Sequence, residues 1–357
     1  MPVAVPAGRR QADAVPDSSS LARRAAAPRV ARVPDDRTGL TWRALEPAGV
    51  AALAVLVAAV EDAAAAPYRT SQDELADRLR ADDLTPSSDT LGGWSSDGVL
   101  RAWAMVDQPA GDERVVRAFL SGGVDPVWTG RGIGRQVLRW SVDRARQRIA
   151  ASGKDAPARI GVFTDDTDAR TAALVEATGL TPVRYYAEMR RPCDRALPDV
   201  VLDRTIGPIT LRPWSDDVEE AARVAHNEAF ADHWGSEPRT RTQWFEGRSM
   251  FAPAWSFVAV DGRDEVVGYL MSGRYEQDWA VAGRSSGYVE RLGVRRAWRG
   301  RGIAVALLVA AIRAYRADGV QDAELGVDTA NPSGAHRLYE RLGFEVFHRA
   351  TLRSIEL

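Results

Sequence analysis

The chain contains the same short segment twice, and this repeat constrains the fold more than any other feature. Residues 129–138 read TGRGIGRQVL and residues 299–308 read RGRGIAVALL, so five of ten positions are identical. A weaker echo follows each copy, with LVEATGL at residues 174–180 and LYERLGF at residues 338–344. A chain of 357 residues is long enough for two domains, and the repeat indicates that one unit has been duplicated.

The elements expected around the two copies also correspond. Each unit is predicted to contain a strand, two helices, a strand pair, a long strand, the glycine segment with its helix, and a closing strand–helix–strand. Up to the glycine segment the predicted ranges are 41–45, 48–65, 71–81, 90–95, 99–106 and 115–124 in the first unit and 209–213, 215–230, 240–247, 256–261, 266–272 and 287–294 in the second. We therefore expect an α+β protein with two tandem domains, each a mostly antiparallel sheet flanked by helices.

Composition shifts divide the chain further. Residues 1–38 are rich in Pro, Ala and Arg and are expected to form a disordered tail. Residues 39–191 are expected to form the N-terminal domain and residues 209–357 the C-terminal domain. Residues 192–208 contain three prolines with mixed charges and are the predicted linker.

Composition also excludes several kinds of protein. The net charge is −2 and the arginines are scattered, so we expect no nucleic-acid partner. Cys193 is the only cysteine and the four histidines lack zinc-binding spacing, so we expect neither disulfides nor a metal site. The longest apolar run is too short for a bilayer, and the first 38 residues lack a secretory apolar core. We expect a cytoplasmic monomer or homodimer without a membrane partner.

The repeated glycine segment has the pattern of an anion-binding loop. In each copy a predicted strand runs into it and a predicted helix follows, so backbone N–H groups and the helix dipole would face an anion. Glycine leaves room for phosphate oxygens and permits positive φ. A Walker loop is excluded because Lys154, the only lysine, lies elsewhere, and a Rossmann loop would follow the first strand of its unit. The alternative is a tight turn without a ligand.

Residues 299–304, RGRGIA, match the [RQ]xxGx[GA] acetyl-CoA loop of the GNAT-type N-acetyltransferases. Downstream, Asn331, Leu338-Tyr339-Glu340 and Gly343-Phe344 resemble a second segment of that family. The chain resembles the family well over residues 209–357 and more loosely over residues 41–190. Its tandem arrangement is similar to that of actinobacterial double-GNAT proteins of the mycothiol synthase type. The resemblance implies splayed sheets, acetyl-CoA as the cosubstrate and no metal.

The resemblance also assigns residues to the cofactor. In the C-terminal domain the implied pantetheine contacts are Leu292, Val294 and Asn331, and the implied pyrophosphate loop consists of Arg299, Gly300, Arg301, Gly302, Ile303 and Ala304. In the N-terminal domain the corresponding candidates are Gly130, Arg131, Gly132 and Gly134.

Amine acetylation requires a neutral amine, a polarised thioester carbonyl and a proton for the departing thiolate. Glu290 is the candidate base, because strand alternation would place Tyr288, Glu290, Leu292 and Val294 on one face, toward the predicted cleft. The alternative for Glu290 is a structural pair with an arginine. By resemblance Tyr339 is the candidate general acid, since a phenol is protonated at neutral pH. The alternative for Tyr339 is packing on its helix.

The N-terminal domain departs from this pattern, because Leu120 aligns with Glu290 and Val175 with Tyr339. Neither side chain can exchange a proton, so this domain is expected to be catalytically degenerate.

In the C-terminal domain the resemblance places the end of the first helix beside the acceptor. The candidate acceptor contacts there are Glu228, His233 and Trp234, and the alternative is that they pack or cap.

The expected function is transfer of an acetyl group from acetyl-CoA to a primary amine of a small molecule or peptide by direct attack, catalysed by the C-terminal domain. Two alternatives stay open. One is a coenzyme A-binding sensor without turnover, and the other is a transferase for a longer acyl chain.

Overall fold

The computed structural model describes residues 20–109, 111–200, 202, 207–330 and 334–357, with Asp36 described by its backbone alone. Within this part of the chain all strands join one mixed sheet in the order β1-β2-β3-β4-β5-β12-β6-β11-β10-β9-β8-β7. The strands are β1 Thr41–Arg43, β2 Thr90–Trp94, β3 Leu100–Asp107, β4 Val116–Val124, β5 Ala158–Asp165, β6 Thr181–Pro192, β7 Thr210–Pro213, β8 Phe257–Val260, β9 Val266–Gly273, β10 Ser286–Val294, β11 Asp322–Asp328 and β12 Glu345–Glu356.

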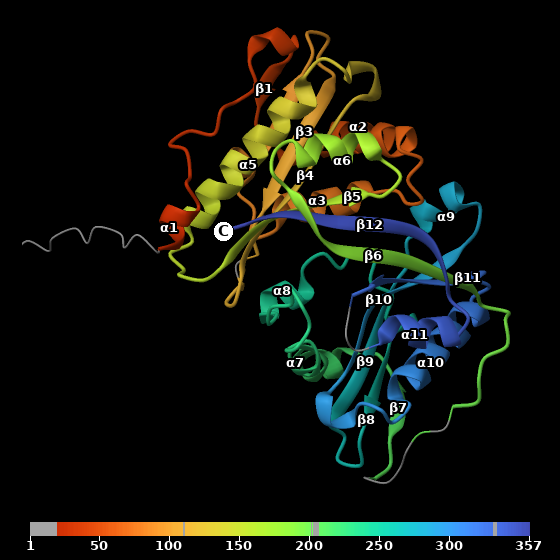
Figure 1. Ribbon diagram of the computed structural model, residues 1–357. Helices are drawn as coiled ribbons and strands as arrows, with labels where there is room; N and C mark the ends of the chain where they lie inside the picture. The colour runs from red at the N-terminus through yellow and green to blue at the C-terminus, as the bar shows by residue number, and fades with distance from the viewer. Residues whose placement is uncertain (1–19, 110, 201, 203–206, 331–333) are drawn as a thin grey trace, which may run out of the picture.

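Helices cover both faces of the sheet (Figure 1). They are α1 Leu21–Arg24, α2 Val50–Ala63, α3 Gln72–Arg80, α4 Pro86–Asp89, α5 Ile133–Ala151, α6 Ala169–Glu176, α7 Glu219–Ala229, α8 Arg241–Phe245, α9 Glu276–Ala282, α10 Ile303–Ala317 and α11 Ala335–Arg341. We call the elements up to β6 the N-terminal half and those from β7 the C-terminal half. The two halves repeat the same order of elements, and the predicted α+β fold class is confirmed. Helix α9 is an addition in the C-terminal half that sequence analysis did not predict.

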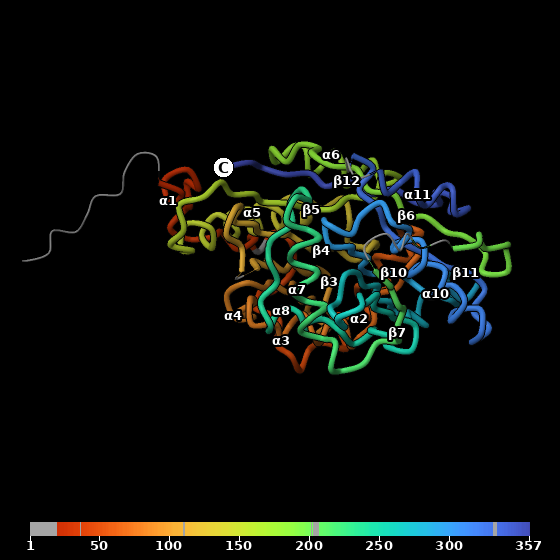
Figure 2. The backbone as a smooth tube through the Cα atoms, turned by 90° about the horizontal axis from the view of Figure 1, so that it is seen from below, coloured from red at the N-terminus to blue at the C-terminus, as the bar shows by residue number. Residues whose placement is uncertain are grey.

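The last strand of each half is shared with the other half. Strand β6 of the N-terminal half pairs with β11, and β12 of the C-terminal half pairs with β5. The two strands also pair with each other, antiparallel, and run side by side across the middle of the molecule (Figure 1). Seen from below, they lie toward one edge of the backbone trace (Figure 2). Among the strands of the described residues, only β4–β5 and β10–β11 pair in parallel. The sheet is therefore continuous, because the last strand of each half pairs with a strand of the other half.

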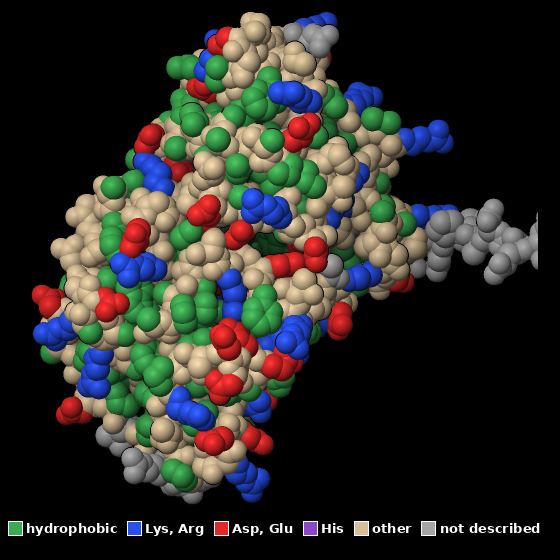
Figure 3. Space-filling view, turned by 180° about the vertical axis from the view of Figure 1, so that it is seen from behind, with side chains coloured by type: hydrophobic (Ala, Val, Ile, Leu, Met, Phe, Trp, Pro, Cys, Tyr) green, Lys and Arg blue, Asp and Glu red, His purple; other side chains and the backbone are tan. Residues whose placement is uncertain are grey.

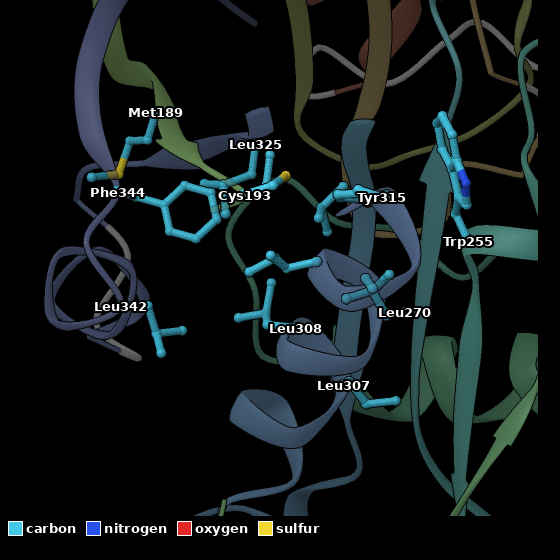
Figure 4. Packing of buried hydrophobic residues seen from close by; sticks show 14 of the residues in the cluster. Met189, Cys193, Trp255, Leu270, Leu307, Leu308, Tyr315, Leu325, Leu342 and Phe344 are labelled. Carbon is cyan, nitrogen blue, oxygen red and sulfur yellow. The ribbon is translucent and has the colours of Figure 1, made fainter. Parts of the chain in front are cut away.

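The hydrophobic cores reflect this exchange. The core of the C-terminal half gathers around α10 and includes Leu307, Leu308 and Tyr315 (Figure 4). Met189 of β6 belongs to the same cluster and is 1% exposed, although it comes from the N-terminal half. In the other direction, Ile355 of β12 packs against the core around α5. Each core is thus completed by an apolar side chain from the other half.

The expectation of a disordered tail over residues 1–38 is wrong for its second part. Residues 1–19 lie outside the described residues, but Leu21 and Ala25 are buried in the core around α5. The Arg146 guanidinium donates to the carbonyl oxygen of Ala25 at 2.6 Å, and the Gln147 amide donates to that of Pro28. Burial of these apolar side chains on a helix outweighs the polar composition of the segment.

A loop of the C-terminal half, residues 231–238, is attached to the N-terminal half by a buried carboxylate. Glu237 accepts hydrogen bonds from the three consecutive backbone N–H groups of residues 113–115, at 3.0 to 3.3 Å. These N–H groups immediately precede β4. A carboxylate that accepts several backbone N–H groups forms strong, charge-assisted bonds.

A second contact between the halves involves α9. The backbone N–H of Arg69 donates to Asp278 at 2.6 Å, and the Gln277 amide donates to Glu74 at 3.1 Å. Arg69 lies in the loop between α2 and α3, and Glu74 lies in the first turn of α3. Helix α9 therefore connects the two halves through hydrogen bonds.

Candidate active site

The glycine loop of the C-terminal half presents unpaired backbone N–H groups at the start of α10. Gly300 and Gly302 both adopt φ of 79°, and Gly302 is the N-cap of the helix. The first helical acceptor is the Gly302 carbonyl, bonded by the N–H of Ala306. In the described residues the N–H groups of positions 300–305 have no partner. A Cβ at Gly300 would meet nothing within 4 Å. The loop fits an anion of phosphate type.

The two arginines of this loop differ in what they do. The Arg299 guanidinium bonds Asp232 and the carbonyl oxygen of Ala229, and therefore ties the loop to the end of α7. Arg301 lies over the ring of Trp298 at 5.5 Å. Its Nη1 is buried and lacks a hydrogen-bond partner in the described part of the chain. A buried guanidinium nitrogen without a partner is costly, so Arg301 is suited to receive an anionic ligand.

Strand β10 separates from β11 after four residues. The parallel register ends at the pair Val289–Leu325, although β10 continues to Val294. Strand β9 remains paired with the other edge of β10. Beyond Val289, the edge of β10 that faced β11 therefore has no strand partner among the described residues. Its backbone amides can bind an extended ligand as an added strand would.

A β-bulge at Glu290 changes which face the side chains occupy. The register between β9 and β10 shifts at this residue. Val289 and, beyond the bulge, Leu292 and Val294 all pack into the core around α10. Tyr288 and Glu290 lie on the opposite face. The prediction that Tyr288, Glu290, Leu292 and Val294 share one face is wrong, because the bulge inserts one residue into the alternation.

Glu290 takes part in a chain of tyrosines and carboxylates. Its carboxylate accepts the Tyr275 hydroxyl at 2.8 Å, and the Tyr275 ring meets the Tyr288 ring edge-on at 5.8 Å. The Tyr288 hydroxyl donates to Glu188 of β6 at 3.0 Å. Burial is the main cause that raises the pKa of Glu188. Glu290 forms no ion pair with an arginine of the described residues, because its hydrogen-bond partner is Tyr275.

Two glycines leave the space for this chain. A Cβ on Gly273 would lie 2.5 Å from the Glu290 carboxylate, and one on Gly326 would lie 2.8 Å from the Tyr288 hydroxyl. Both distances are shorter than van der Waals contact permits. Any larger residue at either position would displace the tyrosine or the carboxylate.

Tyr339 lies on α11 and packs beside the core around α10. Its ring meets Phe344 edge-on at 6.0 Å. Burial raises the pKa of Tyr339 to about 12, so the phenol keeps its proton at neutral pH. Asn331, the remaining predicted pantetheine contact, lies outside the described residues.

Comparisons with known proteins decide the family. A model of the acetyltransferase (GNAT) family matches residues 217–344. A protein of Thermomonospora curvata named mycothiol acetyltransferase is 34% identical over 263 residues, which is 70% of this chain and 76% of the relative. One of Thermobispora bispora with the same name is 33% identical over 231 residues, 62% of this chain and 70% of the relative. The chain belongs to the GNAT family of acetyltransferases.

Solved structures agree with this assignment. A GCN5-related N-acetyltransferase from Sphaerobacter thermophilus matches with a TM-score of 0.68 at 28% identity, over 91% of this chain and 97% of that one. A tandem GNAT protein from the clavulanic acid biosynthesis pathway has a TM-score of 0.64 at 18% identity, over 89% and 98%, and is alike in fold. The GNAT resemblance drawn from the glycine loop is confirmed, and the protein is an acyltransferase.

The corresponding loop of the N-terminal half has the same backbone, and a Cβ at Gly130 or Gly132 would also meet nothing within 4 Å. Gly130 and Gly132 adopt φ of 81° and 80°. The Arg170 guanidinium of α6 donates to the Thr129 hydroxyl at 3.3 Å, and a Cβ on Gly134 would lie 3.4 Å from Leu174 of α6. Helix α6 therefore lies against the loop.

The side chains that surround this loop also differ from those of the C-terminal half. Arg131 lies over the Trp128 ring at 4.4 Å. Leu120 and Val175, which align with Glu290 and Tyr339, are both buried in the core around α5.

The three predicted acceptor contacts lie at the end of α7 with separate neighbours. Glu228 is exposed and lies 3.6 Å from Arg295. The Trp234 ring lies between the guanidinium groups of Arg159 and Arg184, at 4.1 and 4.3 Å, where it joins the two halves. His233 is next to it, with Nδ1 3.0 Å from the Trp234 carbonyl oxygen. Among the described residues, no contact joins Glu228, His233 or Trp234 to Glu290.

Sequence reasoning missed Glu188 and Tyr275 as members of the site, and it placed Tyr288 beside Glu290 without giving it a role. Residues 184–190 read RYYAEMR, an alternation that could have indicated a strand with one polar face. No such pattern says that this strand joins the sheet of the other half. Tyr275 was missed because it precedes α9, which was not predicted.

Asp278 on α9 supplies a stability test for this region. Burial is the main cause that raises the pKa of Asp278 to about 7, with Glu74, Glu324 and Glu61 adding to it and the Arg69 N–H opposing it. A raised folded-state pKa contributes stability below the unfolded value, and this contribution is lost as pH rises through 7. Asp278→Asn should therefore match the wild type at pH 4 and exceed its unfolding free energy by about 1–2 kcal/mol at pH 8.

Urea unfolding at both pH values checks this. Glu276→Gln on the same helix, an exposed residue paired with Arg274, is the matched control and should change stability by less than about 0.5 kcal/mol. A wild type more stable than Asp278→Asn at pH 8 would contradict the prediction.

The described residues contain no group of three or more His, Cys, Asp or Glu side chains placed to hold a metal ion. Within the same part of the chain, no helix combines the length and the hydropathy needed to cross a bilayer.

Proposed function

We propose that the protein is an acetyl-CoA-dependent N-acetyltransferase whose C-terminal half acetylates a primary amine of a small molecule or peptide by direct attack. The observation that carries the proposal is a difference between the halves. The C-terminal half combines an open glycine loop with a carboxylate on β10 and a phenol on α11, where the N-terminal half has Leu120 and Val175. The relatives are named mycothiol acetyltransferase, which supports a small-molecule amine as the acceptor.

The loop would hold the pyrophosphate of acetyl-CoA. The N–H groups of residues 300–305 lie at the N-terminus of α10, so their dipoles and the helix dipole would attract the same anion. A Cβ at Gly300 would meet nothing within 4 Å, which leaves room for that anion. Arg301 would add its unpartnered Nη1, while Arg299 fixes the loop to α7 rather than contacting the ligand. The open edge of β10 beyond Val289, with Leu292 and Val294, would pair with the pantetheine amides.

Glu290 and Tyr339 would manage the protons. An alkylammonium has a pKa of about 10.4, so a base must take a proton before the nitrogen can attack. Glu290, directly or through water, would take that proton. The nitrogen then bonds to the thioester carbon, the carbon–sulfur bond breaks, and Tyr339 Oη gives its proton to the sulfur. The phenol is suited to this because burial keeps it protonated.

The N-terminal half would be a structural partner rather than a second enzyme. Its loop is approached by α6 through Arg170 and Leu174, and its core holds apolar side chains at the two catalytic positions. Its closing strand completes the sheet of the C-terminal half. We propose that the whole protein is located in the cytoplasm.

Matched substitutions in the two loops test which half binds the cosubstrate. Gly302→Val places a β-branched residue at φ of 79° and covers the N–H groups, so the Kd for acetyl-CoA should rise about 10- to 100-fold. Gly132→Val imposes the same strain at φ of 80° and should leave turnover within twofold. Calorimetry measures the Kd and thiol release measures turnover. If Gly132→Val abolished turnover while Gly302→Val did not, the assignment would be reversed.

A further inference from the structure

Three carboxylates on neighbouring strands share one face of the sheet without an ion-pair partner. Glu290 of β10 bonds Tyr275, Glu188 of β6 bonds Tyr288, and Asp328 ends β11. None of the three forms an ion pair with any arginine, lysine or histidine that the structure describes. Glu324, four positions before Asp328 on β11, is by contrast paired with Arg190. In a chain with 47 basic residues, three unpaired carboxylates in one place need an explanation.

Asp328 is the most constrained of the three. It is 6% exposed, and its Oδ1 accepts the Ala330 N–H at 2.9 Å. Its Oδ2 is buried and has no hydrogen-bond partner in the described residues. A buried carboxylate oxygen without a partner costs several kcal/mol, and a bound donor would remove that cost.

The register places Asp328 at the opening between β10 and β11. Strand β10 leaves β11 after Leu325, so β10 does not cover Asp328. On the other side Asp328 is opposite Tyr186, and Gly326 is opposite Glu188. Alternation puts Asp328 on the face of Gly326, which is the face where Glu188 meets Tyr288. The Asp328 side chain therefore lies on the face of the sheet that carries Glu188 and Tyr288.

This region is formed by both halves. Glu188 comes from the strand that the N-terminal half lends to the other sheet. Burial is the main cause that raises the pKa of Tyr68 in the N-terminal half, and the charges of Glu61, Asp165, Glu188 and Asp278 add to it. The surface is hollowed where the two halves meet, and both acidic and basic side chains lie around the hollow (Figure 3).

We propose that the acceptor carries a second protonated amine, which Glu188 and Asp328 bind while the reacting amine lies at Glu290. This inference rests on the proposed function and adds the substrate class, a diamine or a molecule with two amino groups. Two carboxylates in a partly buried site select a cation over a hydroxyl, because only the cation offsets their desolvation. The glutamate lent by β6 would then make the N-terminal half part of acceptor selection.

Three acceptors with the same five-carbon chain test the proposal. 1,5-Diaminopentane, 5-aminopentan-1-ol and pentylamine are compared with the full-length protein and acetyl-CoA, with thiol release as the readout. In the wild type kcat/KM should be at least about tenfold higher for the diamine than for either other amine. Glu188→Gln and Asp328→Asn preserve shape and should reduce this preference about tenfold, mainly through KM. Glu345→Gln on β12, an exposed residue paired with Arg195, is the control and should not change it.

The outcomes separate this inference from the proposed function. Equal kcat/KM for the three acceptors, or an equal loss for all three in both variants, would overturn the second-amine site and leave the acetyltransferase proposal standing. An aminoalcohol as good as the diamine would also overturn it, because charge would then not be recognised. If calorimetry finds no uptake of acetyl-CoA by the wild type, both proposals fail.

Discussion

Replacing Tyr339 with phenylalanine should lower kcat by about 100-fold or more while leaving the KM for acetyl-CoA within about threefold, because a positioned general acid contributes about 10²- to 10⁴-fold. The substitution removes only the proton that the departing thiolate needs. Phenylalanine keeps the edge-on contact with Phe344, so the packing of α11 should be preserved. Circular dichroism and the Tm check that the fold is retained.

The pH dependence sharpens this test. Since burial raises the pKa of Tyr339 to about 12, the phenol stays protonated from pH 6 to pH 9, and the loss in the variant should be constant across that range. Tyr185→Phe, on the exposed face of β6, is the matched control and should retain full kcat. A Tyr339→Phe enzyme with kcat within twofold of the wild type at every pH would show that another group protonates the sulfur.

Removal of the Glu237 carboxylate should lower the unfolding free energy more than any other substitution proposed for this protein. Glu237→Ala leaves the three N–H groups of residues 113–115 without their acceptor, and the unfolding free energy should fall by about 3–4 kcal/mol. Urea unfolding at pH 7 measures the loss. Glu237→Gln keeps one carbonyl oxygen as acceptor and should lose about half as much, which preserves the test if the alanine variant does not fold.

Glu228→Ala provides the comparison for this effect. Glu228 belongs to the preceding helix α7, is exposed, and lies 3.6 Å from its only ion-pair partner in the described chain, Arg295. Its removal should cost less than about 0.5 kcal/mol. Losses of equal size in the two alanine variants would mean that Glu237 does not hold the halves together.

The local architecture could be predicted from the sequence to a large extent. The repeat at residues 129–138 and 299–308 correctly paired the elements of the two halves, because each glycine loop needs a strand before it and a helix after it. Hydrophobic patterns placed the strands and helices around it close to their observed bounds. These features depend on neighbouring residues, and the sequence carries that information locally.

What could not be predicted depends on contacts between distant segments. Strands β6 and β12 have similar patterns and similar lengths, so alternation alone does not say which of them pairs with β5 and which with β11. The bulge at Glu290 has no residue signature, and it changed the face of Leu292 and Val294. Residues 20–38 have the composition of a tail, but Leu21 is buried by helix α5, which lies more than a hundred residues away.

The site was predicted in part for the same reason. The glycine loop and Tyr339 belong to short motifs, so they could be named from the sequence. Glu188 belongs to no motif and reaches Tyr288 only because its strand is inserted into the other sheet. Trp234 was expected near an acceptor, but two arginines hold its ring between the halves.

The shared closing strands have a consequence for biosynthesis. During translation, β5 is synthesised long before β12, residues 345–356, with which it pairs in the folded protein. Until β12 has emerged, the exposed edge of β5 could pair with a strand of another chain. Neither half can reach its final arrangement on the ribosome before nearly the whole polypeptide has emerged. Expression of one half alone would leave that edge open, and a pair of such fragments would be expected to work only when both are made in the same cell.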